Sequence, residues 1–432
     1  MRPECSTVNK MDRSESLYNE SVQVTPGGVS SPVRAFRPYP LFVSKGKGSS
    51  IFDADGREYL DLCMAYGPLI AGHACPHVLD AVSEQMYKGT VYGAPSESEL
   101  RLIECIHNKI PSAEMVRLAC SGTEATMHAI RVARGVTGKD GIVKMNGGFH
   151  GAHDAVLVAA GSGSAGGVPS SKGVLADVAK HTFTAEYNSI ESMANIIEGN
   201  DDIACVIMEP VMGNVGVVTP EKGYLDAVRK LTSDNGVILI FDEVITGFRL
   251  SNSGAQGLYG VVPDMTTMGK IIGGGFPAGA FAGKKSIMEN VAPQGSVYVA
   301  GTFAGNPVSA TAGYAQINLM CSNGNYDKLN ARTAKLTSAL SDLMVDSHTA
   351  GCINTAGSMF SVFFGKDRIT NGTEAMSVDR TAFDKMFRYM LKCGIYLPPS
   401  ALEVEFMSLA HSEDDVAKFE DAFRGFLREL KA

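Results

Sequence analysis

The chain has 432 residues, of which 45% are apolar and 19% charged, a composition typical of a globular protein large enough for two domains. Its net charge of −8, without any Lys/Arg cluster, argues against a nucleic-acid partner, and no apolar run reaches the roughly 18 residues needed to cross a membrane. Nine scattered cysteines without a C-x-x-C pair indicate reduced thiols, and the N-terminus lacks a signal-peptide pattern, so we expect a cytoplasmic protein.

The first part of the chain combines an irregular segment with a hairpin. Prolines and glycines interrupt every turn between residues 25 and 34, so we expect a shaped loop or a flexible leader there rather than a long helix. Residues 50–60 predict a hairpin with its turn at residues 53–56. Residues 76–87 then predict a helix with one apolar face, which includes Met86.

The middle of the chain alternates strands with helices. Short apolar runs predict strands at residues 115–119, 141–145, 203–208 and 237–241. Strands interleaved with helices at this spacing predict an α/β fold with a doubly wound, mostly parallel sheet. We expect this large domain to cover residues 60–310.

The C-terminal part of the chain, residues 311–432, predicts a smaller α+β domain. Its helical patterns and its clearest strand lie at residues 326–346, 359–364, 381–392 and 412–430. We expect the N-terminal segment, residues 1–59, to join this smaller domain.

A segment rich in Gly and Ser covers residues 161–173. Its composition favours a mobile surface linker. Its position inside the α/β region favours a lid over a site, because long loops inside compact domains often act as lids. Composition leaves both interpretations open.

Two polar residues stand out between residues 236 and 275. An apolar run stops abruptly at Asp242, and ligands of open α/β sheets bind outside the carboxyl ends of the strands. Farther on, Lys270 lies between apolar residues and glycines, which indicates a partly desolvated amine that backbone can approach closely. Taken alone, Asp242 is also explained as a structural acid paired with Arg249, and Lys270 as an ordinary lysine at the start of a helix.

A third feature is the run Ser121-Gly122-Thr123 between a strand and a helix. Backbone N–H groups at a helix N-terminus, together with two hydroxyls, favour a phosphate site, although such runs also serve as helix caps. A phosphate cradle, a strand-end carboxylate and a desolvated lysine are together what pyridoxal 5'-phosphate requires of a protein. The carboxylate keeps the pyridine nitrogen protonated, and the lysine forms the Schiff base and moves protons.

Two runs, residues 241–249 and residues 263–275, together resemble the signature of the class III pyridoxal-phosphate aminotransferases. Further stretches resemble the aminomutase branch of that family; these are residues 25–36, 161–163, 169–171, 300–302, 305–307 and 406–411. Of these, the N-terminal and C-terminal stretches distinguish the aminomutases from the ω-aminotransferases. The resemblance implies a fold-type I transferase and a homodimer that shares its active sites. It implies a small-molecule substrate and neither nucleic acid nor membrane as a partner.

The resemblance also implies which residues hold the cofactor. Lys270 carries the Schiff base and moves protons, and Asp242 pairs with the pyridinium nitrogen. The other implied contacts are Ser121, Gly122 and Thr123 at the phosphate, Thr302 from the neighbouring subunit at the same phosphate, and Phe149 and Val244 on the two faces of the ring.

Four residues are implied at the substrate. Ser31 and Arg34 hold its carboxylate, Ser162 lies on the lid, and Glu403 lies near the cofactor. The sequence context of Arg34 alone favours a solvated loop residue, so its assignment to the substrate rests on the resemblance.

The reaction implied by the resemblance converts glutamate 1-semialdehyde to 5-aminolevulinate, a step of tetrapyrrole biosynthesis. The amine form of the cofactor, pyridoxamine 5'-phosphate, gives its amino group to the aldehyde carbon, and the other amine of the bound 4,5-diaminovalerate is taken back. A lid that retains this diamine would serve the reaction. Two alternatives stay open: an aminotransferase that uses an external amino donor, and a catalytically silent cofactor-binding protein.

Three positions depart from the pattern usual in the family. Tyr66 stands where a Trp is usual, Cys120 where an Asn is usual, and Ala304 where a Ser is usual. These residues line or flank the implied pocket, so they concern its shape more than the cofactor chemistry.

The pair His150 and His153, with Asp154, raises the question of a metal. No Cys or further acid completes a ligand set in this run. We therefore expect no metal, and a histidine in this turn that is structural or lies beside the cofactor.

Overall fold

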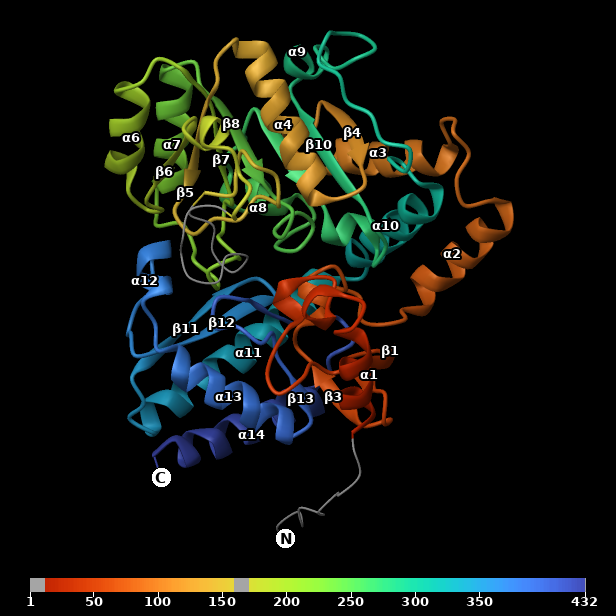
Figure 1. The fold of residues 1–432 in the computed structure, drawn as a ribbon, viewed down its shortest axis with the longest axis vertical. Helices are drawn as coiled ribbons and strands as arrows, with labels where there is room; N and C mark the ends of the chain where they lie inside the picture. Colours follow the sequence, from red (N-terminus) through yellow and green to blue (C-terminus); the bar gives the residue numbers. More distant parts are fainter. Residues whose placement is uncertain (1–11, 159–170, 432) are drawn as a thin grey trace.

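The computed structural model describes residues 12–158 and 171–431. Ser162 and most of the Gly/Ser segment lie outside the described residues, so the lid stays a prediction. Within the described ranges the chain forms two lobes, one around a large sheet and one around two small sheets (Figure 1).

The larger lobe is built on a seven-stranded sheet. In spatial order its strands are β4 (Met115–Ala119), β10 (Gly279–Gly283), β9 (Met265–Met268), β8 (Ile238–Asp242), β7 (Ile203–Met208), β5 (Gly141–Met145) and β6 (Thr182–Ala185). Strands β6, β5, β7, β8 and β9 run parallel to one another, whereas β10 is antiparallel to both β9 and β4. The predicted α/β fold with a mostly parallel sheet is confirmed.

Strand β8 shows why the sequence there is apolar without alternation. Ile238 and Ile240 pack on the side of the sheet that α4 (Gly122–Thr137) covers, while Leu239 and Phe241 pack in the core on the other side. All of them are buried because helices cover both faces of the sheet. Asp242 then emerges at the carboxyl end of β8, at the edge where ligands bind.

The other helices of the larger lobe surround this sheet. They are α2 (Pro76–Lys88), α3 (Glu97–Lys109), α5 (Ala176–Ala179), α6 (Ile190–Glu198), α7 (Tyr224–Asp234), α8 (Gly254–Tyr259), α9 (Lys285–Met288) and α10 (Pro307–Met320). Helix α2 projects from the body of the molecule (Figure 1). Its Met86 is 55% exposed, so the expectation that Met86 lies on a packed face is wrong for the single chain.

The smaller lobe contains two sheets. One has the order β1 (Val43–Lys47), β2 (Ser50–Asp53), β3 (Glu58–Asp61) and β13 (Ile395–Tyr396), and the other has the order β11 (Gly351–Ala356), β12 (Met359–Phe364) and β14 (Glu405–Phe406). Strands β2 and β3 form the expected hairpin, and β13 pairs in parallel with β3. Segments from both ends of the chain thus share one sheet, while the predicted domain boundaries at residues 60 and 310 stay a prediction.

Helices of the smaller lobe cover these sheets (Figure 1). They are α1 (Arg13–Ser21), α11 (Asn325–Asp346), α12 (Gly372–Met376), α13 (Arg380–Lys392) and α14 (Glu413–Lys431). Helix α1 was not expected in the irregular start of the chain; it begins where the Asp12 carboxylate accepts the Ser14 N–H at 3.2 Å. The region predicted to lack a long helix holds two short 3₁₀ turns, η1 (Pro26–Gly28) and η2 (Pro32–Arg34).

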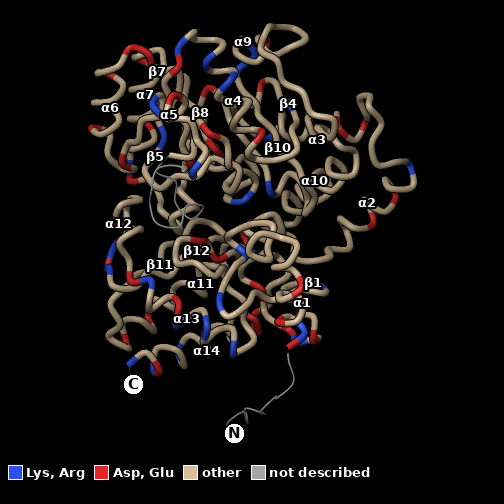
Figure 2. Tube along the Cα trace, in the orientation of Figure 1, with Lys and Arg blue, Asp and Glu red and all other residues tan. Residues whose placement is uncertain are grey.

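Charged residues are distributed over both lobes with the two signs interspersed (Figure 2). In the described ranges, no helix combines the length and the apolar character that crossing a membrane requires.

Candidate active site

Asp242 is held by three donors at the end of β8. Its Oδ1 accepts the Val244 N–H and the Thr267 hydroxyl, both at 3.1 Å, and its Oδ2 lies 2.7 Å from His150 Nδ1. The alternative of a structural pair between Asp242 and Arg249 is therefore wrong, because the Arg249 guanidinium bonds to Gly67, Ser358 and Met407 instead. Asp242 is oriented as an acceptor whose free edge faces the cavity described below.

His150 is the hydrogen-bond partner of Asp242. An ionised carboxylate can only accept, so His150 Nδ1 carries the proton and donates it to Asp242 Oδ2. His150 Nε2 is buried and has no partner among the described residues. The neighbouring His153 approaches Thr126 Oγ1 at 3.5 Å, and burial, with the charge of His150 second, lowers the pKa of His153 to about 4.

Lys270 lies at the start of the 3₁₀ turn η4 (Lys270–Gly273), directly after β9 and Gly269. Its φ of 47° is in the left-handed region, which costs a residue with a Cβ free energy and is frequent at functional sites. Among the described residues Lys270 Nζ has no hydrogen-bond partner. Burial lowers the pKa of Lys270, while the charges of Glu403, Glu209 and Asp242 act in the opposite direction. Burial thus makes the charged form of this amine less favourable than in water, while the acidic groups around it oppose that effect.

The N-terminus of α4 supports both interpretations of Ser121. The Ser121 hydroxyl caps the helix by accepting the Glu124 N–H at 3.1 Å, and the Glu124 carboxylate accepts the N–H of Cys120, the residue before the cap, at 2.9 Å. The first-turn N–H groups of Gly122 and Thr123 have no partner within the helix, as at any helix start, and are available to an anion.

Gly122 permits a close approach between this helix start and the loop after β8. A Cβ at Gly122 would lie 2.9 Å from Val244 Cγ1, and one at Gly269 would lie 3.5 Å from the Gly122 Cα. The glycines therefore allow the helix N-terminus, Val244 and the Lys270 backbone to share one wall.

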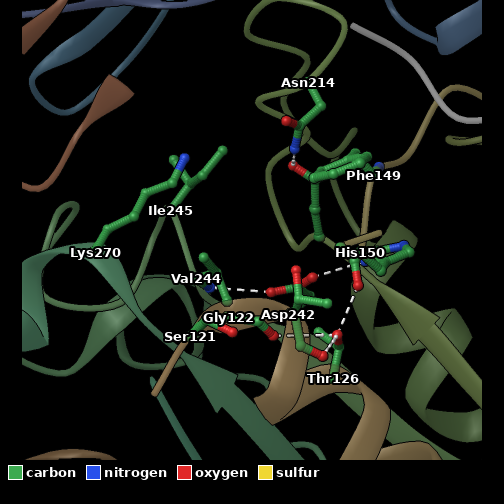
Figure 3. A pocket seen from close by; sticks show the side chains of 13 residues that line it. Ser121, Gly122, Thr126, Phe149, His150, Asn214, Asp242, Val244, Ile245 and Lys270 are labelled. Carbon is green, nitrogen blue, oxygen red and sulfur yellow. Dashed lines mark hydrogen bonds and ion pairs between the residues drawn. The ribbon is translucent and has the colours of Figure 1, made fainter. Parts of the chain in front are cut away.

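These groups meet at one cavity of about 240 Å³. Its lining consists of Ser121, Gly122, Thr123, Thr126, Phe149, His150, Gly151, Glu209, Asn214, Asp242, Val244, Ile245 and Lys270. Figure 3 shows the Lys270 side chain on one side of the cavity and His150 on the other, with Asp242 between them. All the predicted cofactor contacts except Thr302 are thus brought together.

The predicted substrate residues lie outside this lining. Arg34 is exposed in η2, and Ser31 directly precedes that turn. The Arg34 charge acts on Tyr66, where it opposes the rise in the pKa of the Tyr66 phenol that burial causes. Glu403 is buried, and its charge acts on both Tyr66 and Lys270. Arg34 and Glu403 therefore belong to one electrostatic neighbourhood beside the cavity.

Two other predicted residues, Thr302 and Ser162, are not among the described residues that line this cavity. Thr302 is exposed on this chain and does not line its cavity. Ser162 lies outside the described residues.

The prediction from sequence missed Glu209 and Asn214. The Glu209 carboxylate follows β7 directly and accepts the N–H groups of Phe149 and Gly213 and the Asn214 amide at 3.2, 2.8 and 2.9 Å. Burial raises the pKa of Glu209, and the charge of His150 opposes that rise. The strand-end rule that pointed to Asp242 also applies to Glu209, whereas no local pattern marks Asn214.

The cavity fits pyridoxal phosphate by the chemistry of its donors. A buried carboxylate fixed by three hydrogen bonds suits a pyridinium nitrogen, an amine without a hydrogen-bond partner suits an aldehyde carbon, and open helix N–H groups suit a phosphate. The doubly wound sheet and this site define a fold-type I pyridoxal-phosphate-dependent transferase.

The chain belongs to the class-III aminotransferase family, whose model matches residues 33–415. Among curated proteins it is 52% identical to a glutamate-1-semialdehyde 2,1-aminomutase from Archaeoglobus fulgidus, over 96% of this chain and 99% of that protein. It is 50% identical to the protein of that name from Methanocella arvoryzae, over 98% of this chain and the whole of that protein.

Solved structures show the same fold. An omega-transaminase from Sphaerobacter thermophilus matches with a TM-score of 0.91 at 32% identity, over 97% of this chain and 98% of that one. A glutamate-1-semialdehyde aminomutase from Pseudomonas aeruginosa matches with a TM-score of 0.87 at 25% identity, over 97% and 94% of the two chains, and a variant of it is in complex with PMP.

Proposed function

We propose that the chain uses pyridoxal 5'-phosphate to convert glutamate 1-semialdehyde to 5-aminolevulinate, through bound 4,5-diaminovalerate and without an external amino donor. The single observation that carries this proposal is the meeting of Asp242, Lys270 and the α4 N-terminus at one cavity. Curated relatives that span nearly the whole chain at 50–52% identity bear the name of the enzyme for this reaction. The reaction belongs to tetrapyrrole biosynthesis.

When bound, the cofactor supplies an electron sink and, cycling with pyridoxamine 5'-phosphate, a carrier for the amino group. Asp242 would hold the pyridine nitrogen through its carboxylate, whose direction the hydrogen bond from His150 fixes. Lys270 provides the amine that attaches the cofactor and moves protons, a task that a lowered pKa assists. The remaining proposed contacts are Ser121, Gly122 and Thr123 at the phosphate and Phe149 and Val244 at the ring faces.

The substrate residues extend this site. Arg34, with Ser31, would hold the substrate carboxylate through charge-assisted hydrogen bonds. Glu403 would lie beside the reacting carbons, which its electrostatic effect on Lys270 supports. Ser162 would contribute from the Gly/Ser segment, whose closure would retain the diamine and exclude water.

We further propose a homodimer in which Thr302 of the partner subunit completes the phosphate site. Large apolar side chains near Thr302 and at the end of α2 support a covered surface: Tyr87 is 93% exposed, Tyr298 72% and Phe303 61%. We place the enzyme in the cytoplasm, and the eight cysteines in the described ranges, all free, support a reducing compartment.

The test is to supply purified protein and cofactor with glutamate 1-semialdehyde, with and without an amino donor, and to measure 5-aminolevulinate. Product without a donor supports the proposal. Product only with a donor would show an aminotransferase, and no product under either condition would indicate a silent cofactor-binding protein.

The likeness to the omega-transaminase, which has the higher TM-score of the two solved structures, makes a donor-dependent aminotransferase the second candidate. Covalent capture tests the lysine itself: borohydride reduction should fix the cofactor on the wild type and not on Lys270→Ala. Continued labelling of that variant would show that another lysine attaches the cofactor.

A further inference from the structure

We propose that Arg249 and Tyr66 are positioning residues that together form a strut, which fixes the backbone carrying Arg34 beside the Lys270 cavity. The proposal rests on the function proposed above, in which Arg34 holds the substrate carboxylate. Neither Arg249 nor Tyr66 lines the cofactor cavity, so their effect would pass through the segments that they connect.

Arg249 is a fully buried cation that is bonded to neutral groups. Its guanidinium donates to Ser358 Oγ and Met407 O, each at 3.0 Å, and to Gly67 O. Its Cζ lies 5.1 Å from the centroid of the Phe406 ring. Within the described ranges no carboxylate forms an ion pair with Arg249. Burying such a charge costs free energy, which indicates that these contacts serve a purpose other than stability alone.

The contacts of Arg249 join three segments that are far apart in the sequence. Gly67 follows the 3₁₀ turn η3 (Met64–Tyr66), Ser358 directly precedes β12, and Met407 directly follows β14. Arg249 itself lies in the loop that follows Asp242 at the end of β8. It therefore connects the larger lobe to the ends of strands β12 and β14 in the smaller lobe. Burial lowers the pKa of Arg249 to about 9, which leaves the guanidinium charged at neutral pH.

The turn that Arg249 holds is strained. Met64, Ala65 and Tyr66 are three consecutive residues with side chains in the left-handed region, with φ values of 44°, 56° and 64°. Such backbone persists only where its surroundings hold it in place. Asp61 Oδ1 fixes the start of the turn by accepting the Cys63 and Met64 N–H groups, and Arg249 fixes its end at Gly67 O.

Tyr66 extends the strut from this turn to the N-terminal segment. Its hydroxyl donates to Val33 O at 2.6 Å, next to Arg34 in η2. In the same short turn, the Arg34 N–H donates to Ser31 O and the Ala35 N–H to Pro32 O, both at 3.1 Å. The proposed chain of contacts therefore runs from Arg249 through Gly67 and Tyr66 to the backbone of Arg34.

The same turn also approaches Lys270. A Cβ at Gly67 would lie 3.4 Å from Lys270 Cδ. The positive charge of Arg249 contributes to the lowered pKa of Lys270, after the larger effect of burial. That charge would act in the same direction on the Lys270 nitrogen when it attaches the cofactor, because a nearby cation disfavours protonation of either form. Removing the Arg249 charge should then move the pH midpoint of the bound cofactor's visible absorbance upward, an effect that a purely structural residue would not produce.

The primary test compares holoenzymes of the wild type, Tyr66→Phe and Tyr187→Phe. Tyr187→Phe is the matched control, because its hydroxyl also donates to a backbone carbonyl, Pro210 O at 2.7 Å, away from Arg34. The readouts are kcat, KM and the hydrogen exchange of residues 33–36. One neutral hydrogen bond corresponds to a change of roughly 3- to 10-fold. We expect Tyr66→Phe to raise KM by that factor, change kcat less than about 2-fold, and speed exchange at Arg34 and Ala35.

A second pair of variants separates charge from geometry at Arg249. Arg249→Lys keeps the charge but loses the guanidinium fork, so KM should rise while the absorbance midpoint stays. Arg249→Met loses both, so KM and the midpoint should rise together. Should neither Arg249 variant fold, the Tyr66 comparison still decides the proposal, since it removes a single hydroxyl.

Unchanged KM in Tyr66→Phe, or unchanged exchange at residues 33–36, would overturn the strut. An equal effect of Tyr187→Phe on those amides would overturn it as well. Failure of the proposed function has a different signature: the wild type would then make no 5-aminolevulinate without a donor, while the exchange comparison would still report on the strut.

Discussion

The hydrogen bond between His150 and Asp242 permits a sharp prediction, because one substitution can preserve its donor and another can remove it. The amide nitrogen of Asn is bonded to Cγ, as Nδ1 of His is, so His150→Asn keeps an N–H donor near Asp242 Oδ2. His150→Leu keeps much of the volume and removes the donor. We expect His150→Leu to lower kcat and weaken cofactor binding, and His150→Asn to stay close to the wild type.

The magnitude follows from the geometry. The two atoms are 2.7 Å apart, and the side chains of His150 and Asp242 are 0% and 4% exposed. A hydrogen bond to a charged group contributes about 1.5–3 kcal/mol. If the whole of this free energy stabilises the transition state, its loss in His150→Leu corresponds to roughly a 10- to 150-fold decrease in kcat.

The assay measures kcat and, independently, the Kd of the cofactor by titration of apoprotein. His153→Leu serves as the control, because His153 is half-buried on the same turn but makes no hydrogen bond to Asp242 among the described residues. Combining His150→Leu with Asp242→Asn should add little to the loss caused by Asp242→Asn alone. Equal losses in His150→Asn and His150→Leu would refute the reasoning, since the donor would then be irrelevant.

The remaining predictions concern three other contacts. Glu243 is fully buried, and its carboxylate accepts hydrogen bonds from Thr246 Oγ1, Ala255 N and the backbone and side chain of Gln256. Glu243→Gln should therefore lower the free energy of unfolding, measured by denaturant titration, by about 3 kcal/mol. The same change at the exposed Glu104 should not lower it. Gly122→Ala should raise the cofactor Kd roughly 10-fold, because the new methyl group displaces Val244. Gly135→Ala on the same helix, whose methyl group would meet Val297 Cγ2 at 2.7 Å, should leave this Kd unchanged. Equal effects of the two changes would contradict a phosphate site at the α4 N-terminus. Burial lowers the pKa of Lys270 below 10.5, so its neutral amine should persist to lower pH. The rate of Lys270 acylation in apoprotein should therefore reach half its maximum at a lower pH than the rate of acylation of N-acetyl-lysine. The same or a higher midpoint pH for Lys270 would show that desolvation does not dominate.

Local patterns were sufficient for much of the fold. Strands β5, β7 and β8 are short runs buried on both faces of the sheet, which explains why they stand out in the sequence, and the edge strand β4 is a short apolar run that is partly buried. Strands β9 and β10 were missed because Met265–Met268 contains two threonines and Gly279–Gly283 is rich in Gly and Ala, neither of which gives an apolar strand signal. The antiparallel β10 between β9 and β4 therefore had no counterpart in the sequence.

The candidate site, like the fold, could be predicted only in part from the sequence. Asp242 and the Ser121–Thr123 run are marked by their positions relative to a strand and a helix, and Lys270 is marked by its apolar and glycine neighbours, all of which a sequence reveals. The partners of Arg249 are not, because Gly67 and Met407 are 182 and 158 residues away from it along the chain. An ion pair between Arg249 and Asp242 was the alternative interpretation because the two opposite charges are close in the sequence. In the folded chain, Arg249 instead bonds to segments that are distant in the sequence.

The measurement that tests the central claim most directly is the number of 5-aminolevulinate molecules made per active site from glutamate 1-semialdehyde as the only source of amino groups. An enzyme that returns the second amine to its own cofactor regains its starting form after each cycle, so we predict many turnovers per site with no donor present. Product that stops at one equivalent per site, and resumes only when an amino donor is added, would contradict the account.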